Sequence, residues 1–181
     1  VEAHVATARM ALEKNDAKVA SQSLAKALEL DPDDPEIFYL SSLAWQGTDS
    51  IKATQMLNRS LELNPKFVPS LLFVAESRMN EENYDTAEEL LGQIEAINAK
   101  LPKLWALRAA IAHLRGEYEK EGEARKKGLE PWALNPEVDH IIGKHLALHY
   151  RFQESIAYQK RALEMDADYV PAMSQLAQDL L

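Results

Sequence analysis

The chain has 181 residues, of which 46% are hydrophobic and 27% charged, so it can bury a core and is not a disordered tail. Its net charge of −9, from 20 basic and 29 acidic residues, repels phosphate backbones and disfavours a nucleic-acid-binding protein. The absence of cysteine excludes a disulfide scaffold and a thiolate zinc site. No apolar run approaches the roughly 18 residues that span a bilayer, so no membrane insertion is predicted.

The predicted elements are helices throughout, because Ala, Leu, Glu and Lys dominate the long segments and only six glycines are present. No alternating strand pattern is present, so the fold is expected to be all-α. In chain order we expect five helical hairpins and then one short helix. The turn-like sequences that split the hairpins are 14-KNDA-17, 46-QGTDS-50, 81-EENYD-85, 115-RGEY-118 and 149-HYRF-152.

The ends of the second helices repeat along the chain. The stretches 23-SLAKALELDPDD-34, 56-MLNRSLELNPK-66 and 158-YQKRALEMDAD-168 place Ala27, Ser60 and Ala162 at equivalent positions. Ser60 lies 33 residues after Ala27, and Ala162 lies 102 residues, or three times 34, after Ser60. Prolines that open helical segments give the same spacing. This period predicts a single repeat array over 1–181. Its units are 1–34, 35–67, 68–101, 102–135, 136–169 and the partial unit 170–181.

The units resemble the tetratricopeptide repeat, a helical hairpin with small residues where its helices cross and larger residues between hairpins. The resemblance covers the whole chain. It implies a right-handed superhelical solenoid of about five hairpins plus a C-terminal helix, with the first helices lining a concave groove. The residues that carry it include Ala20, Leu24, Ala27 and Pro32; Trp45, Ala53, Leu57, Ser60 and Pro65; Ala75, Tyr84, Ala87 and Leu91; Trp105, Ala109, Gly116 and Tyr118; and Gly143, Phe152, Ser155 and Ala162.

The repeat pattern breaks in the fourth unit. Glu121, Arg125 and Gly128 occupy positions that should hold a small, an aromatic and a small residue. Pro131 then ends the second helix early, so we expect a shortened or rotated helix with Trp132 packed as a plug. The alternative is ordinary degeneracy of the repeat.

The sequence contains no phosphate-binding glycine loop, nucleophile-elbow serine or cysteine nucleophile, so we predict no catalytic site, no cofactor and no metal site. His145 and His149 stand one helical turn apart with His140 nearby, and this spacing can hold a metal ion. The stretch between them lacks the glutamate of a zinc protease, and packing histidines are the alternative. The basic run 124-ARKKG-128 lies among glutamates and fits a solvated helix face.

The family arrangement, projected onto this sequence, gives a candidate partner-binding groove on the first helices. Its apolar middle and charged ends are typical of a protein-binding surface. The alternative is that part of this strip belongs to the core. The groove residues are Arg9, Tyr39, Leu40, Leu43, Leu72, Phe73, Glu76, Met79, Lys103, Leu107, His113, His140 and Lys144.

Chaperone-binding members of the family grip a peptide carboxylate with Lys, Asn and Arg from successive first helices. The corresponding positions here are Val5, Arg9, Leu40, Pro69 and Phe73, and Arg9 alone among them is basic. A carboxylate clamp is therefore not expected.

These features predict a non-catalytic scaffold that binds a peptide or helix of a protein partner. The alternative is a repeat segment of a larger enzyme that positions substrate or mediates assembly, since 149–172 looks similar to arrays that precede peptidase-like domains in large bacterial proteins. The last helix exposes Met173, Leu176 and Leu180. This apolar end predicts further repeats, another domain, or self-association through the uncapped helix.

Overall fold

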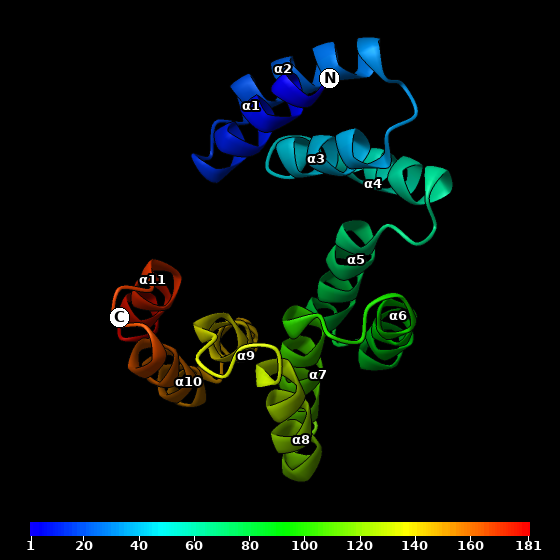
Figure 1. Ribbon diagram of the computed structural model, residues 1–181. Coiled ribbons are helices and arrows are strands. Elements are labelled where there is room, and N and C mark those ends of the chain that lie inside the picture. The colour runs from blue at the N-terminus through cyan, green and yellow to red at the C-terminus, as the bar shows by residue number, and fades with distance from the viewer. The chain divides into compact units, whose positions relative to one another are not determined.

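The computed structural model describes all 181 residues and contains eleven α-helices and no strand (Figure 1). The helices pair in chain order into five hairpins followed by one last helix, as predicted. None of them has the length and apolar content to span a bilayer. They are α1 (Glu2–Glu13), α2 (Ala17–Leu30), α3 (Pro35–Trp45), α4 (Ser50–Leu63), α5 (Val68–Asn80), α6 (Tyr84–Ile97), α7 (Pro102–Leu114), α8 (Tyr118–Leu129), α9 (Pro136–Leu148), α10 (Phe152–Met165) and α11 (Val170–Asp179).

The chain divides into two compact units, Val1–Leu71 and Leu72–Leu181, which are described separately below. The boundary between them falls inside α5. We call them the N-terminal unit and the C-terminal unit.

Two of the helices that open hairpins, α3 and α9, begin with a side-chain cap and a proline. Asp34 caps α3 by accepting a hydrogen bond from the backbone N–H of Glu36, and Asn135 caps α9 in the same way. Pro35 and Pro136 occupy the first turn, where the missing N–H would have no intrahelical partner. The prolines therefore mark the starts of these helices.

The repeated endings of the second helices are helix stops built by one side chain. Helices α2, α4 and α10 end at Asp31, Asn64 and Asp166, whose backbones are extended. Each of these side chains accepts a hydrogen bond from the backbone N–H two residues further on, at 3.0 to 3.3 Å. The acidic or amide residue at this position is thus part of the turn.

Four of the turns inside hairpins share one backbone geometry. A residue with positive φ follows the first helix, and the N–H of the next residue bonds to a carbonyl five residues back, at 2.8 to 2.9 Å. This arrangement satisfies carbonyls at the helix end and favours glycine or asparagine. The residues with positive φ are Asn15, Glu82, Gly116 and Tyr150.

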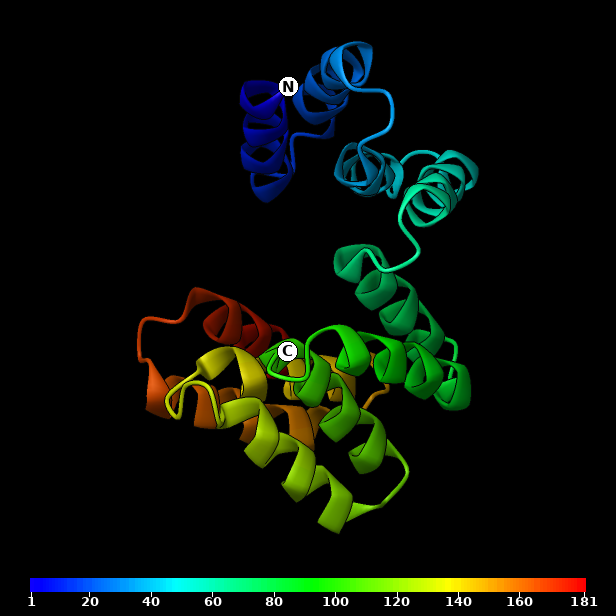
Figure 2. The ribbon, with the colours of Figure 1, turned by 45° about the vertical axis from the view of Figure 1, so that its right-hand side comes forward.

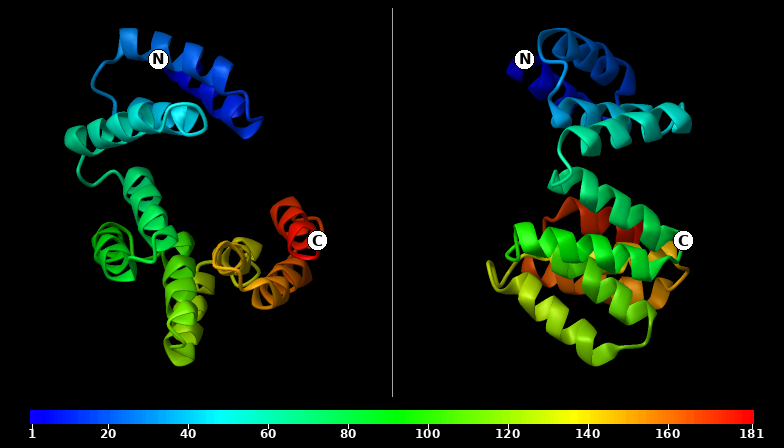
Figure 3. Two further views of the ribbon diagram at one scale, coloured as in Figure 1. Left: turned by 180° about the vertical axis from the view of Figure 1, so that it is seen from behind. Right: turned by 90° about the vertical axis from the view of Figure 1, so that its right-hand side faces the viewer.

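The N-terminal unit packs two hairpins, α1–α2 and α3–α4, through a contact between α2 and α3 (Figure 3). Ala20 and Ala27 are fully buried, and Leu24 and Ile37 fill the space beside them. Small side chains let the helices approach, and the larger ones supply most of the apolar burial. This is the division of roles that the repeat pattern predicts.

In the C-terminal unit, α7 is the central helix and contacts α6, α8 and α9 (Figures 1 and 2). Its residues 104–107 and 109–113 are all buried. Leu104, Leu107 and Ile111 are at most 1% exposed. Burial of each such apolar side chain contributes about 1.5–3 kcal/mol to the stability of the fold. α10 packs on α9, and α11 packs on both, with Met173 and Leu180 exposed.

The fourth hairpin has the short second helix that was expected, since α8 has 12 residues whereas α2, α4, α6 and α10 have 14. The prediction that Trp132 packs as a plug is wrong, because its side chain is 58% exposed. A Cβ at Gly128 would lie 3.2 Å from Cγ1 of Val138 and 3.4 Å from Cβ of Trp105, so both side chains lie close beside this glycine. These two side chains fill the space, and Trp132 stays in the loop outside it.

Candidate functional site

In the N-terminal unit, the predicted groove residues form a partly accessible surface on α1 and α3. Arg9 pairs with Glu36 across the two helices. The rings of Tyr39 and Phe67 meet edge to face, with their centres 6.0 Å apart. Leu43 is half-buried. Leu40 is 5% exposed and belongs to the core, so it does not line an accessible surface. A cleft of ≈ 290 Å³ lies beside this surface, lined by Val1, Glu2, Val5, Ala6, Arg9, Asp34 and Glu36.

In the C-terminal unit, three first helices meet at a polar cluster. Glu76 of α5 forms an ion pair with Lys103 of α7, in which Nζ lies 2.6 Å from Oε1. His145 of α9 places its Nε2 3.7 Å from the other carboxylate oxygen, too far for a hydrogen bond but within ion-pair range. Sequence reasoning selected Glu76 and Lys103 for the groove, and the structure brings them together and adds His145.

The electrostatics of this cluster favour an ionised Glu76. Burial raises the pKa of the carboxyl group, but His145 and Lys103 outweigh this effect and lower it to about 2. Burial has the opposite consequence for His145, whose pKa is lowered even though Glu76 partly compensates. Both shifts act in the same sense at neutral pH, where the lowered pKa values leave Glu76 ionised and the His145 imidazole neutral.

A second contact joins α5 and α9 directly. His149, at the end of α9, has its Nε2 3.1 Å from the carbonyl oxygen of Met79 and its Nδ1 2.8 Å from that of His145. Its ring also lies 6.1 Å from the ring of Tyr84. The third and fifth hairpins thus touch each other across the fourth.

Several predicted groove residues are consequently inside the molecule. Met79 and Leu107 are fully buried, Leu72 is 8% exposed and His113 is 9% exposed. The expectation that these four side chains line an open groove is not met. Small residues such as Ala106 and Ala110 on α7 let its neighbours approach closely, so its inward face becomes core.

The remaining predicted residues of this unit keep accessible surface. Phe73 is half-buried and Lys144 is exposed. Nδ1 of His140 lies 2.9 Å from Oε1 of Gln159. The His140 and Tyr169 rings meet edge to face, with their centres 5.7 Å apart. Burial lowers the pKa of His140, with the Gln159 hydrogen bond acting in the other direction. Among the predicted residues of this unit, the polar side chains that keep accessible surface are thus Glu76, Lys103, His140 and Lys144.

His140 and His145 of α9, and His149 just after it, contact groups on neighbouring helices. His140 contacts α10, His145 contacts α5, and both ring nitrogens of His149 face backbone carbonyl oxygens. No group of three or more metal-ligating side chains is assembled around them or elsewhere in the chain.

The polar residues of the fourth hairpin form contacts that sequence reasoning missed. Arg125 makes two hydrogen bonds to Asp139, at 2.5 and 2.6 Å. Glu121 accepts a hydrogen bond from the Tyr158 hydroxyl and lies 2.9 Å from Nδ1 of His113. The departures from the repeat pattern were visible in the sequence, but their partners on α9 and α10 were not.

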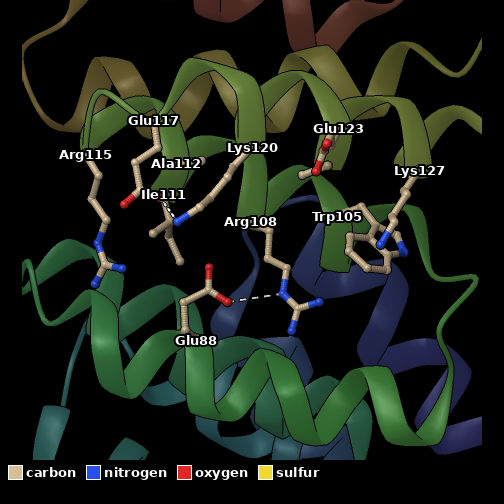
Figure 4. A pocket seen from close by; sticks show the side chains of 11 residues that line it. Glu88, Trp105, Arg108, Ile111, Ala112, Arg115, Glu117, Lys120, Glu123 and Lys127 are labelled. Atoms are coloured by element: carbon tan, nitrogen blue, oxygen red, sulfur yellow. Dashed lines mark hydrogen bonds and ion pairs between the residues drawn. The ribbon is translucent and has the colours of Figure 1, made fainter.

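A charged cleft of ≈ 290 Å³ separates α6 from α8 over the side of α7 (Figure 4). Arg108 reaches from α7 to Glu88 and Glu95 of α6, at 3.1 and 2.6 Å. Trp105 forms one end of the cleft, and the Lys127 ammonium lies 4.2 Å from its ring centre. Both partners of Arg108 belong to the protein itself. The ion pairs of Arg108 therefore join α7 to α6 along the wall of the cleft.

Residues 1–34 match the sequence model of the tetratricopeptide repeat. No curated protein matches the chain in sequence. Among solved structures, the thermophilic tetratricopeptide-repeat protein TTC0263 of Thermus thermophilus is similar over 99% of this chain and 98% of its own, with 18% identity and a TM-score of 0.72. MamA is similar over 90% of this chain and 96% of its own, with 18% identity and a TM-score of 0.58. MamA from Desulfovibrio magneticus RS-1, from its residue 41 to its end, is similar over 93% of this chain and 96% of its own, with 15% identity and a TM-score of 0.59.

Proposed function

We propose that this tetratricopeptide-repeat protein is a non-catalytic scaffold that holds a peptide or helix of a protein partner against its first helices. The observation that carries the proposal is that the first helices keep polar side chains accessible beside half-buried apolar ones. Three of these polar groups also make a contact within the protein: Arg9 with Glu36, Glu76 with Lys103 and His140 with Gln159.

Each unit carries its own proposed surface. On the N-terminal unit it consists of Arg9, Tyr39 and Leu43. On the C-terminal unit it consists of Phe73, Glu76, Lys103, His140 and Lys144. Mixed apolar and charged surface of this kind suits a protein partner, in which aromatic and aliphatic anchors supply affinity and charges at the rim supply specificity.

Capture of partners by the whole chain tests this proposal. The chain, the Tyr39→Ala/Phe73→Ala variant and a matched control are used as baits, and co-purified proteins are compared. The control is Ile51→Ala/Ile97→Ala, because these apolar residues are 73% and 41% exposed on the second helices α4 and α6. We expect the first variant to lose capture by about tenfold or more and the control to retain it.

Circular dichroism of each bait separates binding from folding. Both variants should keep the helical signal of the unchanged chain. Equal loss of capture in the two variants, or no loss in Tyr39→Ala/Phe73→Ala, would show that the partner does not bind the first helices.

A further inference from the structure

Three hairpin turns of the C-terminal unit come together at one edge, which we call the turn face and define as residues 81–85, 115–119 and 148–154. Arg115 of the α7–α8 turn pairs with Asp85 at 2.5 Å and lies 5.6 Å from the Tyr84 ring centre. His149 of the α9–α10 turn contacts the same ring. The centre of the His113 ring lies 5.5 Å from that of Tyr118 and 6.0 Å from that of Tyr158 on α10. The three turns therefore form one continuous surface.

Exposed apolar side chains gather on the turn face. Tyr150 is 83% exposed, Tyr118 62%, Leu148 52% and Phe152 44%. The rings of Tyr150 and Phe152 meet edge to face at 6.2 Å. Single exposed apolar residues are ordinary, but a cluster of aromatic side chains is typical of an interaction surface. The turns of the N-terminal unit, 14-KNDA-17 and 46-QGTDS-50, carry no aromatic residue.

Tyr150 occupies a backbone position that disfavours it. Its φ is +63°, in the left-handed region, and Asn15, Glu82 and Gly116 fill the equivalent position in other hairpins. A bulky side chain is rare there because its Cβ crowds the backbone. The ring of Tyr150 is also almost fully in solvent, so packing does not offset this cost.

The charges of the turn face point to the chemistry of its partner. Every basic side chain in and beside it already has a carboxylate partner: Arg115 with Asp85, Arg151 with Glu154, Lys120 with Glu117 and Arg78 with Glu81. Glu82 and Glu119 are exposed and have no basic partner among these ion pairs. The surface therefore has an excess of negative charge around its aromatic rings.

We propose that the turn face docks an arginine- or lysine-rich segment of a partner protein. Guanidinium or ammonium groups stack on the faces of Tyr118, Tyr150 and Phe152, and the free carboxylates of Glu82 and Glu119 pair with them. The net charge of −9 attracts such a segment over a longer range. This surface consists of the turns and the helix ends beside them, and it shares no residue with the proposed surface on the first helices.

A labelled dodecapeptide of alternating arginine and glycine serves as the probe, and its binding to the whole chain is measured by fluorescence anisotropy. The same peptide with citrulline in place of arginine keeps the shape and removes the charge. We expect Tyr118→Ala and Tyr150→Gly each to weaken binding of the arginine peptide by about two- to fivefold. Trp132→Ala, which removes an exposed aromatic residue outside the turn face, should leave it unchanged.

Thermal unfolding keeps the test independent of misfolding. Tyr150→Gly relieves the backbone and should raise the unfolding midpoint by roughly 2–4 °C while it weakens binding. Three results would overturn the proposal: equal binding of the citrulline peptide, undiminished binding of the arginine peptide to both tyrosine variants, or an equal loss in Trp132→Ala.

Discussion

Arg125 on α8 and Asp139 on α9 form a two-point ion pair that fastens the fourth hairpin to the fifth. The guanidinium Nε and Nη2 lie 2.5 and 2.6 Å from the two carboxylate oxygens, and the Asp139 side chain is fully buried. The Asp139 hydrogen bonds raise the pKa of Arg125 above its ordinary value. An aromatic residue was expected where Arg125 stands, so a polar clamp here takes the place of an apolar contact.

Removal of the arginine should be costly because it leaves a buried carboxylate without a partner. We expect Arg125→Ala to lower the free energy of unfolding by about 3–5 kcal/mol, measured by urea denaturation. Arg125→Leu with Asp139→Leu should recover most of the loss. The matched control is Arg59→Ala, whose ion pairs are exposed and contribute at most about 1 kcal/mol. A similar small effect in both arginine variants would contradict the clamp.

Gly143 should not tolerate even one methyl group. A Cβ at this position would lie 2.4 Å from Nε2 of Gln159 and 3.1 Å from the carbonyl oxygen of Ser155. Gln159 is fully buried and bonded to His140, so it cannot simply move away. We expect Gly143→Ala to destabilise the chain by about 1–3 kcal/mol.

Gly92 provides the control, because nothing lies within 4 Å of its Cβ position in α6. Gly92→Ala should therefore stabilise the chain by about 0.5–1 kcal/mol through helix propensity. Thermal unfolding of the two variants should shift in opposite directions, and a shift in the same direction would refute the close helix crossing.

The ionised Glu76 should make the free energy of unfolding depend on pH in the acid range. Its folded-state pKa is about 2, against an ordinary value of 4.5, so the folded protein holds this proton less tightly than the unfolded chain. The resulting stability is fully present above pH 4.5 and is lost as the pH falls toward 2. Glu76→Gln should cost about 3 kcal/mol at about pH 7 and clearly less at about pH 3, measured by urea denaturation. A difference that does not change with pH would exclude this linkage.

Ser60 should be required although alanine occupies the equivalent positions 27 and 162. Its hydroxyl donates to the carbonyl oxygen of Pro35 at 2.7 Å and lies 2.8 Å from the hydroxyl of Ser70. Both serines are fully buried. We expect Ser60→Ala to cost about 1–2 kcal/mol, and the added change Ser70→Ala to recover part of it. Ser174→Ala, on an exposed position of α11, should have no measurable effect on unfolding.

The sequence was enough to predict the helices and their pairing. The resemblance to tetratricopeptide repeats is confirmed by the match of residues 1–34 and by the fold of the similar solved structures. Helix starts could be located because Pro35, Pro102 and Pro136 are fixed by local chemistry within one turn. Helix stops repeat for the same reason, since one Asp or Asn side chain makes each of them.

Contacts between hairpins could not be obtained in this way. Whether Leu107 lines a groove or the core depends on how closely α5 and α9 approach across α7, and no local pattern records that distance. The partners of Glu121 and Arg125 lie on other helices, so the sequence showed the break in the repeat without showing what compensates it. Which of the accessible first-helix residues bind a partner stays a prediction.

The contacts of His149 with Met79 and of His145 with Glu76 change how this unit should fold. They join segments about 70 residues apart, whereas neighbouring hairpins of a repeat protein make short-range contacts. Closing a loop of that length costs conformational entropy. We expect the contacts between α5 and α9 to offset this cost only once α7 has packed between them. The third, fourth and fifth hairpins should therefore lose hydrogen-exchange protection together, as one cooperative block, instead of fraying one repeat at a time.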